Sequence, residues 1–284
     1  MFTRRNFIKT AMASGAGLNA VSPIMAFLSE RKLNNIGFIS GILGSDIRGD
    51  NWQSVLKQTV DYGYSEIEIG SHLGDSASSF LAYCKDIGLK PVAGGLGSLT
   101  EDVDTIKKSL DRLNALESQY AVIYWPYFVG APFTPDDCKR SVEVMNKTGE
   151  ICKSRGITLC WHNHADEFVT MDDGNLPFDY LMDNTEEDLV QCELDIYWVT
   201  KGGADPVEVL KKYPGRYKVL HVKDMAPGTE QDFAYPGEGI IDWKGVFAES
   251  TNQGIQHFNV EKDNAENGLA GLRSSAPFLK GLTF

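Results

Sequence analysis

The feature that most constrains the fold of this chain is a regular alternation of short β-rich runs with segments of helical periodicity. Strand–helix alternation of this kind is typical of a parallel sheet covered by helices. The predicted strands span residues 35–40, 65–69, 89–93, 120–124, 157–164, 189–195, 217–224 and 255–261. The predicted helices span residues 52–62, 76–87, 101–116, 134–154, 176–183, 206–212 and 243–249.

Eight such units favour closure into a barrel over an open doubly wound sheet. In the second half of the chain, strand ends lie about 26 to 40 residues apart, the length of one unit when about 250 residues close an eightfold barrel. No Gly-x-Gly-x-x-Gly motif follows the first strand, and the glycine-rich run at 94–97 is expected to be a flexible loop at the barrel top, not a phosphate-binding loop. The sequence therefore predicts an α/β protein with a single (β/α)8 TIM barrel over residues 34–284.

The N-terminus is expected to be a leader and not a part of the barrel. Arg4 and Arg5 precede a weakly apolar stretch over residues 10–28, which is typical of a twin-arginine export signal. The alternative is a frayed amphipathic N-terminus. Gly, Asn and Pro interrupt the stretch, so a stable membrane span is not expected; the leader is either cleaved or kept as a tether. Residues 1–33 are thus predicted to direct the protein to the periplasm.

Charge and cysteine content restrict the partners and the redox state. The 284 residues include 27 Lys and Arg against 39 Asp and Glu, a formal net charge of −12. Because binding to nucleic-acid phosphates needs clustered cations, no nucleic-acid partner is expected. The five cysteines lack Cys-x-x-Cys spacing, so all are expected to be reduced and most of them buried. By strand parity, Cys160 and Cys192 should face opposite sides of the barrel wall.

The last four predicted strands each end in residues that bind metals or transfer protons: His162 with His164, then Asp195, His221 and Glu261. A (β/α)8 barrel gathers the C-terminal ends of its strands in one ring, so these side chains are expected to converge. Nitrogen and carboxylate donors of this kind suit a divalent metal ion. The alternatives are histidines hydrogen-bonded in a polar barrel mouth and carboxylates engaged in helix caps or salt bridges.

Separate arguments place two of the carboxylates in the proposed metal site. Asp195 can either cap the next helix or bind a ligand, but Asp205, immediately before Pro206, is the better cap. Glu261 lies in a segment that should be nearly all buried, where an unpaired carboxylate is costly and a cation partner explains it most simply.

Four further side chains are candidates for contacts with a substrate. Glu68 on the second strand and Lys223, which shares the parity of His221, are expected to face inward, with structural salt bridges as the alternative. Trp198 follows the sixth strand. Glu238 lies between two glycines and either reaches over the site or is solvated.

Several sequence motifs fall at these strand ends and in the loops that follow them. They are His-Asn-His-x-x-Glu-Phe (162–168), Leu-Asp-Ile-Tyr-Trp (194–198) followed by Gly-Gly-Ala-Asp-Pro (202–206), Leu-His-Val-Lys-Asp (220–224), Gly-Glu-Gly-Ile-Ile-Asp-Trp (237–243) and Val-Glu-Lys-Asp (260–263). Together they resemble the sugar phosphate isomerase/epimerase group of xylose isomerase-like TIM barrels, over residues 34–284. The resemblance implies one divalent cation, Mn, Zn, Co or Mg, held by Asp195, His221 and Glu261.

The fifth-strand ligand departs from the pattern of that group. The position is usually Glu and here is His162, so either His162 is the ligand or Glu167 turns in from the loop. The resemblance implies a metal-dependent isomerase or epimerase that acts on a sugar or keto-sugar by α-proton transfer through a metal-stabilised enediolate. Glu261, Glu167, His164 and Lys223 are the candidate catalytic residues.

Other activities remain as alternatives. Inosose dehydratase-like members of the group also carry histidines in this stretch and eliminate water, so a sugar dehydratase or hydratase is possible on the same scaffold. Abasic-site endonucleases share the fold but need more metal ligands and a basic surface. A non-catalytic periplasmic sugar-binding barrel is the third alternative. With no basic cluster for a phosphate, the expected partner is a small neutral carbohydrate; oligomeric assembly is left open.

Overall fold

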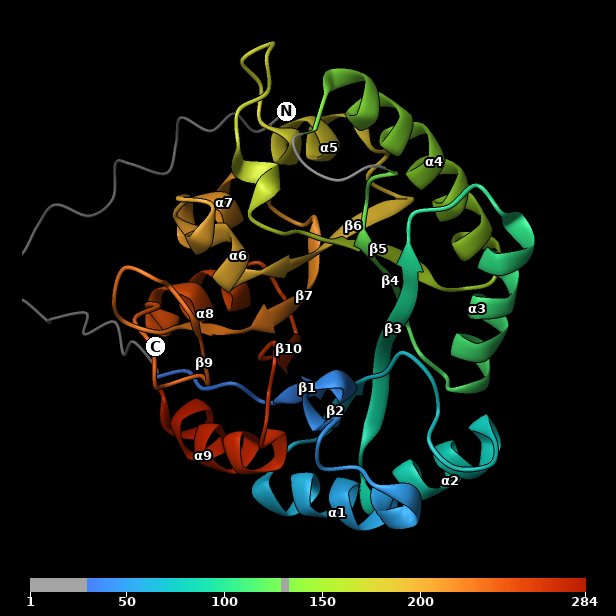
Figure 1. The fold of residues 1–284 in the computed structure, drawn as a ribbon, viewed down its shortest axis with the longest axis vertical. Coiled ribbons are helices and arrows are strands. Elements are labelled where there is room, and N and C mark those ends of the chain that lie inside the picture. The colour runs from blue at the N-terminus through green and yellow to red at the C-terminus, as the bar shows by residue number, and fades with distance from the viewer. Residues whose placement is uncertain (1–29, 129–132) are drawn as a thin grey trace, which may run out of the picture. The chain divides into compact units, whose positions relative to one another are not determined.

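Eight parallel strands close into a barrel within residues 30–128 and 133–284, the part of the chain that the structure, a computed structural model, describes. Around the barrel the order is β1, β2, β3, β4, β5, β6, β7 and β10, and β10 pairs with both β7 and β1. Figure 1 shows the helices in a ring outside the strands. The predicted (β/α)8 barrel is confirmed. The strands are β1 (Gly37–Ile39), β2 (Glu66–Glu68), β3 (Lys90–Ser98), β4 (Tyr120–Trp125), β5 (Thr158–His162), β6 (Val190–Asp195), β7 (Tyr217–Val222) and β10 (His257–Val260).

The predicted leader, residues 1–33, lies outside the described residues except for positions 30–33. The export signal therefore stays a prediction. Arg31 exchanges two backbone hydrogen bonds of 3.0 Å with Phe284. Among the helices of the described residues, none is both long enough and apolar enough to cross a membrane.

The helices begin where the sequence provides caps. Thr134 and Asp137 form a reciprocal capping box at the start of α4, with Pro135 in its first turn. Asp205 caps α7 by accepting two backbone N–H groups of its first turn, as predicted. The helices are α1 (Trp52–Tyr62), α2 (Ala77–Ile87), α3 (Val103–Ala115), α4 (Pro135–Ser154), α5 (Pro177–Asn184), α6 (Ile196–Lys201), α7 (Pro206–Lys212), α8 (Trp243–Asn252) and α9 (Gly268–Gly281).

Helices α6 and α9 and a small antiparallel sheet of β8 (Asp224–Met225) and β9 (Phe233–Ala234) were not predicted. Helix α6 is only six residues long and rich in β-branched and aromatic residues, which have low helix propensity. Helix α9 has glycines at both ends and contains Pro277. Tertiary packing overrides these local preferences, because α9 buries Leu272 and Leu279.

The glycine-rich run at 94–97 lies within β3, so its predicted role as a flexible loop is wrong. A Cβ on Gly94 would lie 2.3 Å from the carbonyl oxygen of Ile69, and one on Gly95 would lie 2.4 Å from the Tyr124 ring. The glycines therefore allow close approach of the neighbouring strand and leave room inside the barrel for Tyr124. The Tyr124 hydroxyl donates a hydrogen bond of 2.6 Å to Oε1 of Glu68.

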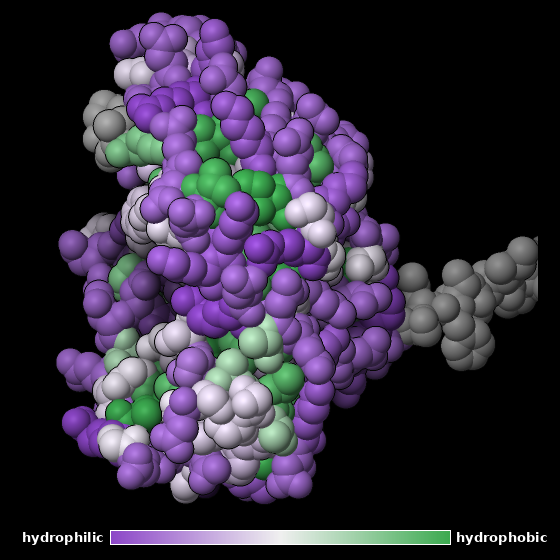
Figure 2. Space-filling model, turned by 90° about the vertical axis from the view of Figure 1, so that its right-hand side faces the viewer, coloured by the Kyte–Doolittle hydropathy of each residue, from purple (hydrophilic) through white to green (hydrophobic). Residues whose placement is uncertain are grey.

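The main hydrophobic core lies between the strands and the helices, and the barrel interior is partly polar. Cys160 belongs to a small apolar cluster inside the barrel, whereas Cys192 belongs to the main core, as strand parity predicted. All five cysteines are free and buried. The side of the molecule on the right of Figure 1 is largely hydrophilic, with apolar side chains confined to smaller patches (Figure 2). Buried polar side chains on the strands include Glu66, Glu68, Glu193, His221, His257 and Asn259.

Hydrogen bonds to Asp224 hold the segment between β7 and α8 in place. Its carboxylate accepts three backbone N–H groups from residues 237–241 at 3.0–3.2 Å and the indole N–H of Trp243 at 2.9 Å. A Cβ on Gly239 would lie 2.1 Å from Oδ1 of Asp224, so this position has no room for a side chain. The motif that spans residues 237–243 therefore has a structural role in holding this segment.

Candidate active site

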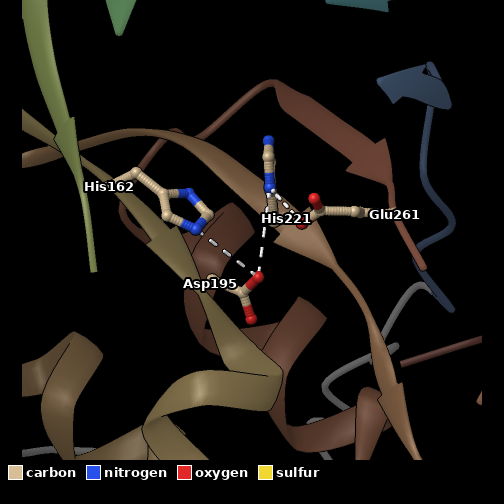
Figure 3. A group of neighbouring side chains, drawn as sticks. All are labelled: His162, Asp195, His221 and Glu261. Atoms are coloured by element: carbon tan, nitrogen blue, oxygen red, sulfur yellow. Dashed lines mark hydrogen bonds and ion pairs between the residues drawn. The ribbon is translucent and has the colours of Figure 1, made fainter. Parts of the chain in front are cut away.

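Four side chains from neighbouring strands of the barrel point toward one another. His162 ends β5, Asp195 ends β6, His221 lies on β7 and Glu261 follows β10. One ligand atom of each lies within 4.8 Å of all the others. His221 Nδ1 is 2.8 Å from Glu261 Oε2, and Asp195 Oδ2 is 3.8 Å from His162 Nε2 and 4.0 Å from His221 Nδ1 (Figure 3). The barrel thus brings together the four residues that the sequence singled out as metal ligands.

Asp195 both caps a helix and faces this cluster. Oδ1 accepts the backbone N–H of Trp198 at 3.0 Å and so caps α6. Oδ2 is buried and makes no hydrogen bond. The sequence reading treated the cap and the site as alternatives, and this was wrong because α6 was not foreseen. One oxygen of the Asp195 carboxylate caps the helix, and the other faces the cluster.

The cluster fits a divalent cation. Two imidazole nitrogens and two carboxylate oxygens form a donor set that suits Zn, Mn or Co, which bind such atoms at about 2.0–2.2 Å. Oδ2 of Asp195 is a buried acceptor that makes no hydrogen bond, with the Lys223 ammonium 3.6 Å away, and a bound cation would satisfy it. Burial and the charge of Glu261 raise the pKa of Asp195 to about 7, and a nearby cation would favour its ionised form.

Two further glutamates, Glu68 and Glu193, lie behind the histidines on the interior side. Glu193 Oε1 is 3.1 Å from His162 Nδ1 and 3.1 Å from His221 Nε2, while Glu68 Oε2 is 2.9 Å from His221 Nε2. The sequence reading missed Glu193, although it shares strand parity with Asp195 and could have been found from that alternation.

These carboxylates determine the charge on His221. Burial disfavours the charged imidazole, but Glu193, Glu68 and Glu261 outweigh burial and raise the pKa of His221 well above its ordinary value. Burial, reinforced by the charge of Glu68, raises the pKa of Glu193 well above the usual range of a carboxyl group. Metal binding at His221 would therefore displace a proton.

His162 and His164 are neutral. Burial lowers the pKa of His162 well below its ordinary value and lowers that of His164 to about 4. The His164 ring stacks on Trp125 with 3.8 Å between ring centroids and an angle of 5° between the planes, and Trp198 lies 5.3 Å away. Neutral imidazoles keep a lone pair with which to bind a metal ion or accept a proton.

Lys223 lies among carboxylates and aromatic rings. Its Nζ hydrogen bonds to Asp263 and lies 3.5 Å from Glu261 Oε2 and 3.6 Å from Asp195 Oδ2. The same atom is 4.8 Å from the centre of the Trp198 ring. Burial opposes the charge, but Asp195, Glu261 and Asp263 outweigh it and raise the pKa of Lys223. Asp263 lies in the Val-Glu-Lys-Asp motif but was not predicted as a site residue.

The cluster opens into a cavity of about 260 Å³. Of the predicted site residues, His162, His164, Trp198, Lys223 and Glu261 line it. The remaining lining residues are Ile39, Tyr124, Trp125 and Asp263.

Asp195 and His221 belong to the cluster but do not line this cavity. Three further predicted residues lie outside both the four-residue cluster and the cavity lining. Glu68 is fully buried beneath it. Glu167 is also fully buried: its Oε2 accepts the backbone N–H of His164 at 2.9 Å, and burial raises its pKa to about 8. Glu238 is exposed and accepts a hydrogen bond of 3.3 Å from Ser274 on α9. The structure therefore brings His162, and not Glu167, to the cluster.

Comparisons with known proteins agree with this architecture. A curated inosose dehydratase from Clostridium perfringens (strain ATCC 13124) is 31% identical over 128 residues, which cover 39% of this chain and 42% of that protein. An inosose dehydratase from Geobacillus kaustophilus is 25% identical over 239 residues, covering 70% of this chain and 76% of that protein. The match thus spans less than half of the first relative's length and about three quarters of the second's.

A solved structure shows the same likeness over most of its length. A sugar phosphate isomerase/epimerase from Parabacteroides distasonis ATCC 8503 superimposes with a TM-score of 0.73 at 25% identity, covering 87% of this chain and 93% of that one. The family model described as xylose isomerase-like TIM barrel matches residues 56–282. Because this match covers most of the chain, the protein belongs to the xylose isomerase-like TIM barrel family.

Proposed function

We propose that the protein is a divalent-metal-dependent isomerase or epimerase that acts on a sugar or keto-sugar by moving the proton of the carbon next to the carbonyl group. The observation that carries this proposal is the convergence of His162, Asp195, His221 and Glu261 at the edge of a cavity, with Asp195 Oδ2 buried and without a hydrogen bond. The Parabacteroides structure that carries an isomerase/epimerase description supports the same reaction class.

These four residues would hold the metal ion. A bound divalent ion acts as a Lewis acid that polarises the carbonyl group and so makes the neighbouring C–H bond more acidic. Burial opposes ionisation of Glu261, but His221 and Lys223 outweigh it and keep the pKa of this carboxyl group well below its usual range. Glu261 is therefore ionised at neutral pH, lines the cavity and is positioned to accept the α-proton.

A second base is available on another side of the cavity. His164 follows β5, whereas Glu261 follows β10, and β6 and β7 lie between these strands in the barrel. Because burial holds the pKa of His164 near 4, its imidazole is neutral and can accept or relay a proton. Isomerisation and epimerisation both need a group that returns a proton. The neutral His164 would first take up a proton from solvent and could then deliver it from a different direction.

The cavity favours a neutral sugar over a sugar phosphate. Trp125, which leaves 47% of its surface exposed, and Trp198 provide aromatic faces against which the C–H face of a sugar ring can pack. Lys223 is the lining residue with a positive charge that persists at neutral pH, and carboxylates already surround it. A phosphate group would therefore meet an excess of negative charge.

A dehydratase is the second candidate. The curated relatives from Clostridium perfringens and Geobacillus kaustophilus are inosose dehydratases. Dehydration begins with the same removal of an α-proton, after which a hydroxyl group leaves from the next carbon as water. The charged ammonium of Lys223 beside the cavity is suited to protonate that leaving hydroxyl.

Proton exchange in D₂O tests the proposal and separates the two reactions. The full chain is stripped of metal, reloaded with Mn, Co or Zn, and incubated with a panel of keto-sugars, aldo-sugars and inososes while NMR spectra are recorded. Deuterium at the α carbon of an isomerised product indicates an isomerase or epimerase, whereas an unsaturated product formed with loss of water indicates a dehydratase. Failure of every substrate to exchange with metal bound would favour a sugar-binding barrel without catalysis.

Glu261→Gln should abolish exchange, because an amide cannot accept the proton. Glu238→Gln is the matched control, since this glutamate is exposed and does not line the cavity. Exchange without metal, or exchange that survives in Glu261→Gln, would contradict the mechanism.

A further inference from the structure

We infer that Glu193 is a positioning residue that holds both His162 and His221 with fixed ring nitrogens facing the metal cluster. The inference rests on the metal site of the proposed function and extends it to the interior of the barrel. It assigns Glu193 no contact with substrate and no direct bond to the metal ion.

The geometry of the two histidines is complementary. His162 directs Nε2 toward Asp195 and Nδ1 toward Glu193, whereas His221 directs Nδ1 toward Glu261 and Nε2 toward Glu193. A single oxygen, Oε1 of Glu193, thus lies 3.1 Å from one nitrogen of each ring. If both of these nitrogens carry hydrogen, Glu193 accepts both N–H groups and the opposite nitrogens present lone pairs to the cluster.

The strand register places Glu193 for this role. His162 is directly opposite Glu193 on β5 and β6, and His221 is opposite Asp195 on β6 and β7. Glu193 and Asp195 are two positions apart on β6, so their side chains point to the same face of the strand. That face therefore provides both a residue of the cluster and the carboxylate that supports the cluster.

The two histidines depend on Glu193 to different extents. For His221, Glu68 provides a second carboxylate, with Oε2 at 2.9 Å from Nε2. For His162, the hydrogen bond of Nδ1 within the described residues is to Glu193. Removing the Glu193 carboxylate should therefore release His162 and leave His221 oriented by Glu68.

A competing interpretation is a second metal ion, because ligand atoms of Glu68, Glu193 and His221 also lie within 4.8 Å of one another. Two ions would require His221 to bind through both ring nitrogens at once and to lose both of its N–H protons. Nε2 of His221 instead lies at hydrogen-bond distance from both carboxylates, 2.9 Å from Glu68 Oε2 and 3.1 Å from Glu193 Oε1, where an N–H donor satisfies them. We therefore expect one ion per chain.

The test compares variants of the full chain in the affinity for zinc and in the histidine tautomers. Affinity is measured by competition with a chromophoric chelator, and tautomers by long-range ¹H–¹⁵N correlation spectra of the zinc-loaded protein labelled at its five histidines. Glu193→Met, which keeps the chain length and removes the acceptor, should lower zinc affinity by about 10- to 100-fold, the usual effect of losing such a partner. His162 should then lose its single tautomer while His221 keeps Nε2–H.

Two variants serve as comparisons. Glu193→Gln retains a neutral acceptor oxygen and should lose less affinity than Glu193→Met; it also carries the test if Glu193→Met does not fold. Glu66→Met removes a buried glutamate that hydrogen bonds to His257 at 2.9 Å on the same barrel, and zinc affinity should be unchanged.

The outcomes are distinguishable. If the wild-type chain takes up no zinc, the metal site fails and this inference falls with it. If the wild type binds one ion and both Glu193 variants retain its affinity and tautomers, the inference alone is wrong. Uptake of two ions per wild-type chain would overturn it in favour of a second metal site.

Discussion

Asp195 and Trp198 are joined by a hydrogen bond that divides the Asp195 carboxylate between two tasks. Oδ1 accepts the Trp198 N–H at 3.0 Å and caps α6, while Oδ2 faces the cluster without a hydrogen-bond partner. Trp198, in the first turn of that helix, lines the cavity. The orientation of a cavity wall and the orientation of a proposed metal ligand therefore depend on one side chain.

Substitutions at Asp195 should separate these tasks. Asp195→Asn keeps an oxygen for the cap and loses the negative charge, so thermal stability without metal should change little. Metal affinity should fall by more than about 100-fold, beyond the usual effect of an outer partner. Asp195→Ala loses the cap as well and should cost about 1 kcal/mol more in unfolding free energy. Metal titration and denaturant unfolding measure both effects, and full metal occupancy in Asp195→Asn would show that Asp195 is not a ligand.

His162 and Glu167 should differ in their effect on metal affinity. His162→Ala removes a nitrogen of the cluster and should weaken binding at least about tenfold. Glu167→Gln should leave the affinity unchanged, because its carboxylate is bound to the backbone of His164 and does not line the cavity. Calorimetric titration of the metal-free proteins measures this, and the reverse order would mean that the loop brings Glu167 to the metal.

Glu167 should instead affect how the free energy of unfolding depends on pH. Burial raises its pKa from 4.5 to about 8, so the folded protein holds a proton that the unfolded chain releases. Its contribution therefore becomes less favourable as pH rises from about 4.5 to 8. Glu167→Gln should match the wild type near pH 5 and exceed its unfolding free energy by a few kcal/mol near pH 8.5, at about 1.4 kcal/mol per pKa unit. Urea unfolding at the two pH values measures the difference, and a difference independent of pH would mean that Glu167 titrates normally.

Export should depend on the paired arginines. The double variant Arg4→Lys with Arg5→Lys should stay in the cytoplasm, because the twin-arginine signal is read through its guanidinium groups. Lys9→Arg, which leaves the pair intact, is the matched control and should be exported. Cell fractionation and immunoblotting measure the distribution, and unchanged periplasmic yield of the double variant would refute the predicted route.

Local signals in the sequence account for most of the barrel, and tertiary packing accounts for what was missed. The strand positions follow from buried β-rich runs, and the α4 and α7 starts follow from Thr134 and Asp205, whose caps act within one turn. Helix α6 was missed because its residues favour strands, and its cap at Asp195 could be recognised only once the helix was known.

The candidate site shows the same limit. Convergence of four strand ends follows from barrel geometry, which the alternation of elements already implies. The positions of Glu167 and Glu238 depend on loop paths, which strand parity does not determine. Glu193 was not predicted because its hydrogen-bond partners lie on two other strands, whose register against β6 the sequence does not show.

Asp224 has a consequence for how this scaffold can change. Its carboxylate accepts hydrogen bonds from backbone N–H groups of residues 237–241 and from the Trp243 indole, and Gly239 leaves room for that contact. The tip over residues 227–231 takes no part in these bonds but is tied to α6, because the Tyr197 hydroxyl donates to the carbonyl oxygen of Gln231 at 2.7 Å and Lys201 Nζ donates to that of Glu230 at 2.9 Å. A longer or altered tip would therefore lose its bonds to α6, the helix that Asp195 caps, while the bonds of Asp224 would still hold the rest of the segment.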